Sequence, residues 1–385
     1  MTAPILVFNA GSSSLKFALF DREGPARLAA GKVERIGRGA RLRAARAGEP
    51  ASEQALAPSA GQAEALDAVL DWLAAAMPSA KPSVVGHRVV HGGMDFVAPV
   101  EVDDDVLAKL ERLDPLAPLH QPYNLAAIRR LRERDPGLVQ VACFDTAFHA
   151  HWPDRARRFA LPRALHEQGV RRYGFHGLSY DYLAGELARH APAARRCVLA
   201  HLGSGASVCA VLDGVSVDCS LGFTALDGLP MGTRCGPLDP GVPFHLLRTS
   251  GMDAAAVERM LYEDSGLAGV SGIGGDLRDL LASGSDAARE AIDLFVYHCA
   301  RQVAAMAVAL GGLDALVFSG GIGENAPPVR AAIADLLGLL GVRLDERANA
   351  RGRGEIGAAD GDVRVFVLPT DEEVVIARAC LNRTG

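Results

Sequence analysis

Short runs of apolar residues alternate along the chain with longer stretches whose apolar positions recur every three to four residues. The short runs are bounded by Gly, Asp or Pro and predict β-strands at residues 5–8, 15–20, 84–90, 138–144, 197–202, 208–212, 315–318 and 363–368. The longer stretches predict helices, most clearly at residues 63–76, 106–113, 123–134, 179–189, 286–310 and 327–340. This alternation is typical of an α/β fold with mixed sheets and helices on their faces. Residues 35–60 have no clear period and predict a hairpin or loop.

One pattern occurs twice. Residues 8–14 (FNAGSSS) and 200–206 (AHLGSGA) both connect a buried strand, through a turn of small residues, to a second apolar strand. Gly203 follows Gly11 by 192 residues, which is close to half of the 385-residue chain. The repeat predicts a duplicated domain with a cleft between the copies, although turns rich in Gly and Ser are common enough for coincidence to remain an alternative.

Composition narrows the class of protein. A length of 385 residues favours two domains, or three small ones, and 49% hydrophobic with 22% charged residues is ordinary for a globular protein. The net charge of -6 provides no positive field for nucleic acid. The longest apolar run, residues 303–313, is much shorter than the roughly 20 residues of a membrane helix. With no signal-like amino terminus and seven scattered cysteines, we expect a cytoplasmic protein with no membrane partner.

Three Gly-rich turns are candidates for phosphate binding, since neither the P-loop nor the Rossmann fingerprint occurs. They lie at residues 11–14, 203–206 and 320–325. The third, GGIGEN, follows the strand predicted at 315–318 and precedes the helix predicted from 327, so it is expected to be a turn that could seat a nucleotide. A plain tight turn between strand and helix is the alternative.

Nine sequence blocks together resemble the acetokinase family. In the family's order, they are FNAGSSSLKF (8–17), GHRVVHGG (86–93), PLHQP (118–122), CFDTAFH (143–149), RRYGFHG (171–177), AHLGSGAS (200–207), LPMGTRCGPLDPG (229–241), FSGGIGEN (318–325) and PTDEE (369–373). The resemblance covers nearly the whole chain. It implies two ribonuclease-H-like domains of the acetate and sugar kinase, chaperone and actin superfamily, with boundaries near 1–147 plus 373–385 and 148–372.

The resemblance also implies an activity, the reversible transfer of the ATP γ-phosphoryl group to acetate, with Mg²⁺ or Mn²⁺. Acetate is already an anion at pH 7, since its pKa is about that of Glu, near 4.3, so the reaction needs positioning and positive charge rather than a general base. Carried over residue by residue, the catalytic set is Arg88, Asp145, His176 and Arg234, with Asn9 and Glu372 holding the metal. Because no proton has to be removed, Asp145 is expected to orient an Arg or the metal shell.

The remaining family positions bind substrates. They are Arg88, Val90, Leu119, Phe175 and Ala225 for the acyl group, and Ser14, Lys16, His201, Leu202, Gly203, Ser204, Gly205, Asp276, Leu277, Arg278, Gly321, Ile322, Gly323, Glu324 and Asn325 for ATP or ADP. Lys16 could instead face solvent, and His120 could be purely structural. A zinc site at His149 and His151 is disfavoured because no third ligand has suitable spacing.

Three departures from the family pattern bear on the site. Ser204 stands where Asn is common, Ala225 where Pro is common, and Cys235 follows Arg234 in place of Ser. A smaller wall at Ala225 leaves room in the acyl pocket, and a methylene group is worth only about 1–3 kcal/mol of discrimination. A kinase for propionate or another short-chain acid is therefore the alternative. The thiol of Cys235 is either reactive or buried and inert.

The family further implies a homodimer whose domains close over the substrates, bringing Arg88 of one domain to Arg234 and His176 of the other. A non-catalytic nucleotide switch is the alternative from another class of protein. Against the switch, the chain retains three side chains that such a switch would not need, Arg88, His176 and Arg234.

Overall fold

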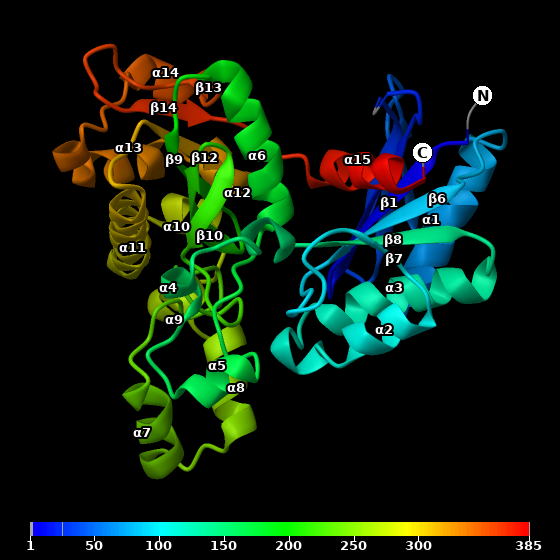
Figure 1. The fold of residues 1–385 in the computed structure, drawn as a ribbon, viewed down its shortest axis with the longest axis horizontal. Helices are drawn as coiled ribbons and strands as arrows, with labels where there is room; N and C mark the ends of the chain where they lie inside the picture. Colours follow the sequence, from blue (N-terminus) through cyan, green and yellow to red (C-terminus); the bar gives the residue numbers. More distant parts are fainter. Residues whose placement is uncertain (1–2, 25, 385) are drawn as a thin grey trace. The chain divides into compact units, whose positions relative to one another are not determined.

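The computed structural model describes residues 3–24 and 26–384, and Figure 1 shows their elements. Two compact units are formed, one from residues 1–148 with 371–385 and the other from residues 149–370. Each unit contains one mixed sheet with helices, so the predicted α/β class is confirmed. In the described part of the chain, no helix is both long and apolar enough to span a bilayer.

The first unit is built on an eight-stranded sheet with the order β5-β4-β3-β2-β1-β6-β8-β7. Its central strand β1 pairs antiparallel with β2 and parallel with β6, and β6 pairs parallel with β8. The strands are β1 (Ile5–Ala10), β2 (Ser14–Phe20), β3 (Arg27–Glu34), β4 (Arg41–Arg46), β5 (Ser52–Ala55), β6 (Val84–Val89), β7 (Val100–Glu101) and β8 (Val139–Phe144). Strands β4 and β5 form the hairpin that was predicted between residues 35 and 60.

Helices cover this sheet because alternate strand residues are apolar. Leu6 and Phe8 of β1 share a buried core with Leu66 of α1. On β6, a Cβ atom at Gly86 would lie 2.3 Å from Ile376 Cγ2, so the last helix, α15, packs almost directly on the backbone of β6. Figure 1 shows α15, in red, beside β1 and β6. The helices of the unit are α1 (Gln62–Ala76), α2 (Asp104–Glu111), α3 (Gln121–Arg134) and α15 (Glu372–Thr384).

The second unit is built on a six-stranded sheet with the order β11-β10-β9-β12-β14-β13. Its strands are β9 (Arg196–Leu202), β10 (Ala206–Leu212), β11 (Val215–Cys219), β12 (Ala315–Ser319), β13 (Gly354–Glu355) and β14 (Arg364–Val367). The helices are α4 (Asp154–Arg157), α5 (Arg163–Glu167), α6 (Gly177–His190), α7 (Gly241–Thr249), α8 (Ala254–Glu263), α9 (Gly266–Ser271), α10 (Leu277–Ser283), α11 (Asp286–Leu310), α12 (Gly320–Asn325), α13 (Pro327–Leu336) and α14 (Glu346–Arg351).

The two sheets repeat the same topology. Strand β9 pairs antiparallel with β10 and parallel with β12, as β1 does with β2 and β6. The 192-residue offset between Gly11 and Gly203 carries the bounds of β2 onto those of β10, and carries the end of β1 onto the end of β9. The duplication predicted from the repeat is therefore confirmed, as is the fold of two ribonuclease-H-like domains that the family resemblance implies.

The GGIGEN segment corrects one expectation. It was predicted to be a turn, but residues 320–325 form a short helix, α12. Gly320 lies at φ +77°, where a Cβ atom would be 2.6 Å from the carbonyl oxygen of Leu202. The chain can therefore turn from strand β12 into a helix at once, because only Gly tolerates both the backbone angle and the close approach. The predicted helix at 327–340 ends at Leu336 and is followed by one 3₁₀ turn, Gly338–Leu340.

Candidate active site

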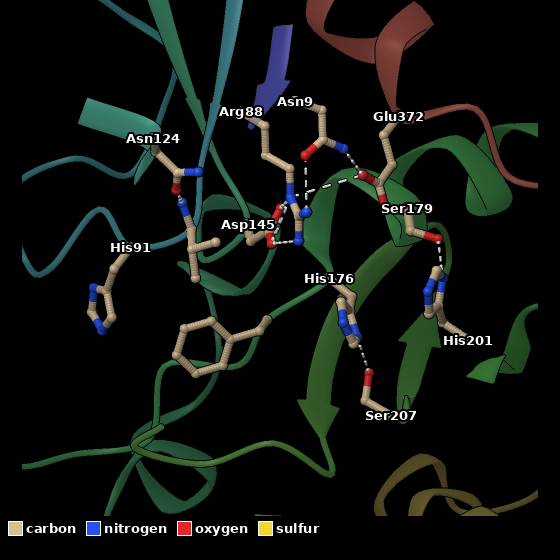
Figure 2. A network of polar contacts seen from close by, with 12 residues as sticks. Asn9, Arg88, His91, Asn124, Asp145, His176, Ser179, His201, Ser207 and Glu372 are labelled. Atoms are coloured by element: carbon tan, nitrogen blue, oxygen red, sulfur yellow. Dashed lines mark hydrogen bonds and ion pairs between the residues drawn. The ribbon is translucent and has the colours of Figure 1, made fainter. Parts of the chain in front are cut away.

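In the first unit, four polar side chains from distant parts of the sequence meet where β1, β6 and β8 end. Asn9 lies in β1, Arg88 in β6, Asp145 directly after β8, and Glu372 at the start of α15. Parallel strands bring their carboxyl ends to one edge of a sheet, which is where α/β proteins place their ligands. Figure 2 shows these side chains pointing toward one another.

Arg88 is the centre of this group. Its Nε and Nη2 donate to the Asp145 carboxylate, with the shortest contact at 2.6 Å, and its Nη1 donates to Asn9 Oδ1 at 3.2 Å. A guanidinium has five N–H groups, and these contacts leave a second hydrogen on each terminal nitrogen. The bidentate pair with Asp145 holds the guanidinium plane in one orientation, from which those hydrogens can bind a planar anion.

Burial affects both members of this pair. The Asp145 side chain is 1% exposed and Arg88 is 19% exposed. Burial alone lowers the pKa of Arg88, but the negative charges of Asp145 and Glu372 outweigh it and raise that pKa, so Arg88 remains a cation. Burial raises the pKa of the Asp145 carboxyl, and the contacts with Arg88 oppose that rise.

Asn9 and Glu372 also contact each other, since Asn9 Nδ2 donates to Glu372 Oε2 at 3.1 Å. The oxygens present here, an amide and carboxylates, are the ligand type that Mg²⁺ prefers. Among the described residues, no three His, Cys, Asp or Glu side chains are grouped closely enough to form a metal cage. The donor set therefore fits a cation that keeps most of its water, as Mg²⁺ does.

The first Gly-rich turn, between β1 and β2, lies beside this group. Gly11 N donates to Ser14 O at 2.8 Å, closing the turn, and Gln62 Nε2 at the start of α1 donates to Gly11 O at 2.6 Å. Ser14 is the first residue of β2 and is half-buried. Lys16 is exposed on the same strand, so its side chain is accessible to solvent.

Two candidate acyl-pocket residues belong to the first unit. Val90 directly follows β6 and is buried, and its backbone N donates to the buried Asn124 side chain at 3.0 Å. Leu119 is half-buried in the turn before α3. His120 is the residue that precedes α3, and its backbone carbonyl accepts from the amides of Tyr123 and Asn124, so its backbone at least has a structural part.

In the second unit, His176 and His201 stack with ring centroids 4.6 Å apart. A serine hydroxyl contacts the Nδ1 of each ring at 2.8 Å, Ser207 for His176 and Ser179 for His201. Figure 2 shows both pairs. His176 lies just before α6 with φ +59°, an unusual angle for a residue with a side chain. Such backbone strain is maintained only where the surroundings impose it, and it accumulates at functional sites.

The second Gly-rich turn lies against His176. A Cβ atom at Gly205 would be 3.4 Å from His176 Nε2 and 4.0 Å from Arg234 Nη1. The same Arg234 nitrogen donates to the carbonyl of Ala225 at 3.3 Å. The turn, the side chains of His176 and Arg234 and the backbone of Ala225 are therefore neighbours, and Ser204 of the turn is exposed.

Helix α12 begins next to the same turn. Gly203 approaches Gly321, because a Cβ atom at Gly203 would lie 3.8 Å from Gly321 N. At the other end of the helix, buried Arg330 donates to the carbonyls of Gly323 and Glu324 at 2.8 and 2.9 Å. A cation at the carboxyl end of a helix is stabilised by the partial negative charge of the last carbonyls. Burial raises the pKa of Glu324, whose carboxylate accepts from the amide of Gly320.

The remaining nucleotide candidates occupy the start of α10. Asp276 accepts from the amide and guanidinium of Arg278, and these hydrogen bonds lower the pKa of Asp276 to about 2. Leu277 is buried in the core, so a ligand could reach it only through its backbone. Arg278 is exposed. Of the acyl-pocket candidates in this unit, Phe175 is buried beside His176 and Ala225 is half-buried.

The surroundings of two further residues bear on their chemistry. Burial raises the pKa of the half-buried Cys235 thiol, which donates to Gly236 O at 3.3 Å, so the thiolate is disfavoured. His149 is buried, with Nδ1 against Ser216 Oγ and Nε2 against the carbonyl of Phe175, so it is a structural histidine.

Sequence reasoning missed the residues that hold the candidate side chains. Ser207 contacts His176 and also Tyr180, and Asn124 contacts both Ala10 and Val90. Ser207 ends the block at 200–207, and Asn124 lies two residues after the block at 118–122. Extending each block by one helical turn and asking which buried polar side chains it contains would have found Asn124 and Tyr180.

Comparison with known proteins identifies the family. Residues 4–378 match the acetokinase family. The chain is 49% identical to an acetate kinase of Rhodopseudomonas palustris, with 98% of each chain covered, and 47% identical to one of Rhizobium meliloti, with 98% and 97% covered. A propionate kinase structure from Francisella tularensis has a TM-score of 0.93 at 36% identity, covering 99% of this chain and all of the other. An acetate kinase structure from Porphyromonas gingivalis has a TM-score of 0.87 at 36% identity, covering 99% of both chains. From its fold, its site and these full-length matches, the chain belongs to the acetokinase family.

Proposed function

We propose that this protein is an acetate kinase, which reversibly transfers the γ-phosphoryl group of ATP to acetate. An acetate oxygen forms a bond to the γ-phosphorus, and the bond from that phosphorus to the oxygen of ADP breaks, giving acetyl phosphate. The observation that carries the proposal is the 49% identity to acetate kinases over the full length of both chains. The Arg88 group provides the chemistry that such a reaction requires.

The chemical problem is to bring two anions together. Acetate is ionised at pH 7 and needs no base, and the loose transition state of phosphoryl transfer leaves little covalent work to the protein. Fixed positive charge in a site with little water supplies most of the rate in such reactions. The proposal therefore assigns no proton transfer to Asp145, which instead orients Arg88 through their bidentate contact.

Three side chains supply positive charge or hydrogen bonds to the reacting groups. Arg88 binds the carboxylate or the phosphoryl oxygens through its two outward hydrogens, and Arg234 contributes a second guanidinium. His176 hydrogen-bonds an equatorial phosphoryl oxygen, its ring being held by Ser207 at Nδ1. An Arg at either position is not replaceable by Lys, which lacks the planar fork of donors.

A metal ion completes the proposal. Asn9 and Glu372 would hold Mg²⁺, or Mn²⁺, through oxygen atoms and bound water. When bound, the cation neutralises phosphate charge. The Asn9 side chain contacts both Arg88 and Glu372. It therefore fixes the distance between the Arg88 guanidinium and the Glu372 carboxylate.

The nucleotide is assigned to the second unit. The backbone of residues 201–205 and 321–325 and the exposed side of residues 276–278 would bind the phosphates, ribose and base. Glycines at these positions let backbone amides approach an anion closely. In the first unit, Ser14 and Lys16 of the matching turn would contact the phosphates.

Propionate is the alternative acyl substrate. The structural similarity to a propionate kinase is a similarity of backbone fold. In sequence, the chain is 47–49% identical to the two acetate kinases named above and 36% identical to the propionate kinase. The proposal is therefore acetate as preferred substrate, with slower turnover of propionate. A cytoplasmic location and a homodimer are part of the same proposal, on family grounds.

The deciding experiment traps the product. The purified protein is incubated with ATP, Mg²⁺, hydroxylamine and one acid from formate to butyrate, and acyl hydroxamate is measured. The reverse reaction is followed as ATP formed from ADP and each acyl phosphate. Acetyl hydroxamate formed at the highest kcat/KM supports the proposal. Absence of any hydroxamate would support a nucleotide switch, and a maximum at propionate would replace acetate as the substrate.

A further inference from the structure

The carboxamide of Asn124 connects two turns of the candidate site in the first unit. Asn124 lies in the first turn of α3 and is only 2% exposed. Its Nδ2 donates to the carbonyl of Ala10 at 2.6 Å, and its Oδ1 accepts from the amide of Val90 at 3.0 Å. Both polar ends of the side chain are therefore used, and both partners are backbone atoms. Figure 2 shows Asn124 beside the group formed by Asn9 and Arg88.

The position of these two backbone atoms explains why a side chain is needed there. The parallel pairing of β1 with β6 runs from Ile5 and Val84 to Phe8 and His87 and then stops. Ala10 and Val90 lie past the last pair. A carboxamide has the same donor and acceptor as a peptide group, so Asn124 bridges the two strands where their own hydrogen bonds have ended.

Candidate functional residues directly adjoin both anchored positions. Asn9 precedes Ala10, and Arg88 lies two residues before Val90. The side chains of Asn9 and Arg88 contact each other at 3.2 Å, so the separation of the two strand ends determines whether that contact can form. Val90 itself is a candidate wall of the acyl pocket, and its amide position sets where its side chain lies.

We propose that Asn124 is a positioning residue that couples the acyl pocket at Val90 to the Asn9 and Arg88 contact. This inference rests on the proposed function of the site. The carboxamide oxygen fixes the position of Val90 in the pocket wall, and so affects the selection among short-chain carboxylates. The carboxamide nitrogen fixes the position of Ala10, and so the position of the neighbouring Asn9 oxygen that would bind a divalent cation.

The neighbouring Gln121 uses its carboxamide differently. Its Oε1 accepts from the amide of His91 and its Nε2 donates to the carbonyl of the same residue. The same Nε2 also donates to the carbonyl of Leu110 in α2 at 3.4 Å. Gln121 therefore joins the turn at His91 to α2, whereas Asn124 joins the two strand ends that carry Asn9 and Arg88. This difference assigns the coupling to Asn124 rather than to the buried amides of α3 in general.

The test separates the two ends of the carboxamide. Asn124→Leu removes both contacts at similar size. We expect the KM for acetate to rise by about tenfold, the acetate-to-propionate ratio of kcat/KM to change by roughly threefold or more, and the Mg²⁺ concentration at half-maximal rate to rise, with the KM for ATP within about twofold. Asn124→Asp keeps an acceptor for Val90 N–H and, with its carboxyl group ionised, has no donor for the Ala10 carbonyl. It should retain the acyl ratio and raise only the Mg²⁺ requirement.

Gln140→Leu is the matched control. Gln140 is another buried carboxamide of the same unit, which contacts His87 Nε2 at 2.8 Å and the carbonyl of Ile128, neither of them a candidate site residue. It should lower the melting temperature without moving the acyl ratio or the Mg²⁺ requirement.

The inference is overturned if Asn124→Leu and Gln140→Leu change the acyl ratio and the Mg²⁺ requirement alike, or if Asn124→Asp moves both readouts together. Should Asn124→Leu fail to fold, the split expected of Asn124→Asp decides alone. Failure of the proposed function differs from all of these, because the unaltered protein would then form no acetyl hydroxamate.

Discussion

Arg88 and Asp145 form a bidentate pair with a shortest distance of 2.6 Å between Arg88 Nη2 and Asp145 Oδ2. The carboxylate is almost completely buried, whereas the guanidinium is partly accessible. The buried member therefore orients the accessible one, which is the arrangement expected of a cation that must meet an incoming anion.

Asp145→Asn should consequently lower kcat more than it weakens binding of ATP. The amide keeps an acceptor but loses the charge and one of the two parallel hydrogen bonds that hold the Arg88 plane. Since misplacement by about 1 Å can cost roughly a hundredfold in rate, we expect a loss of that order in kcat with acetate. Steady-state kinetics by hydroxamate formation measures it. Activity within about twofold of the unaltered protein would remove the orienting role from Asp145.

The second prediction concerns Arg234, the other guanidinium that is proposed to bind the reacting groups. Arg234→Ala should reduce kcat by about 10²- to 10³-fold, the range seen when one donor to a developing charge is removed, while the KM for ATP changes little. Arg234→Lys should restore only part of the rate because Lys lacks the forked donors. Near-normal turnover by Arg234→Ala would exclude the charge-stabilising role.

The anchoring of His176 by Ser207 gives a third prediction. Ser207→Ala removes the contact at Nδ1, which is one of the contacts that orient the ring, so we expect kcat to fall by about tenfold. Ser216→Ala is the control, because Ser216 is a buried serine of the same unit that also contacts a histidine, His149, and a second ring, Trp152. A comparable loss of stability without loss of kcat is expected there. Equal kinetic losses in both variants would mean that Ser207 is merely structural.

Much of the fold could be predicted from apolar periodicity. Strands β1 and β9 are short apolar runs between polar or small residues, and the turns that follow them revealed the duplication. Helix α12 could not be predicted, because it contains three glycines, and Gly disfavours a helix by about 1 kcal/mol per residue relative to Ala. Its formation depends on tertiary contacts, above all those of buried Arg330 with its last carbonyls.

The candidate site shows a similar division. The motifs identified Arg88, Asp145 and Glu372, but the parallel pairing of β6 with β8 that brings Arg88 beside Asp145 was not predicted. The partners that orient such side chains were not identified. Ser207 on β10 meets His176 before α6 across 31 positions of sequence, and nothing in the spacing of a single sequence records that contact.

The acyl pocket gives a fourth prediction. Ala225 is half-buried, and its carbonyl accepts from Arg234. Ala225→Pro adds bulk and also restricts the backbone next to that contact, so the kcat/KM ratio of acetate to propionate should rise, by about five- to a hundredfold if the added ring excludes one methylene. Parallel assays with the two acids measure the ratio. If the ratio is unchanged, Ala225 does not take part in selecting the acyl chain.

Three buried histidines predict how stability depends on pH. Burial lowers the pKa of His87, His91 and His149 to about 4, from an ordinary value of 6.5. Between pH 6.5 and pH 4, these histidines bind protons in the unfolded chain but stay neutral in the folded protein. The contribution of these three histidines to stability is therefore complete above about pH 6.5 and is lost as the pH falls toward 4, with each histidine contributing up to about 1.4 kcal/mol per pH unit to the slope.

Replacing one of these histidines should make that slope shallower. In His149→Gln the side chain can still pair with Ser216 and with the carbonyl of Phe175 but no longer titrates, so the free energy of unfolding should fall less steeply between pH 6.5 and 4.5 than in the unaltered protein. Urea unfolding at a series of pH values measures both slopes. The control is His245→Gln on α7, which removes a histidine from the protein surface rather than from the core, and the slopes of the two variants are compared. A histidine that folding keeps buried and neutral must contribute to this slope. An unchanged slope in His149→Gln would therefore show that protonation of His149 does not drive the loss of stability in acid.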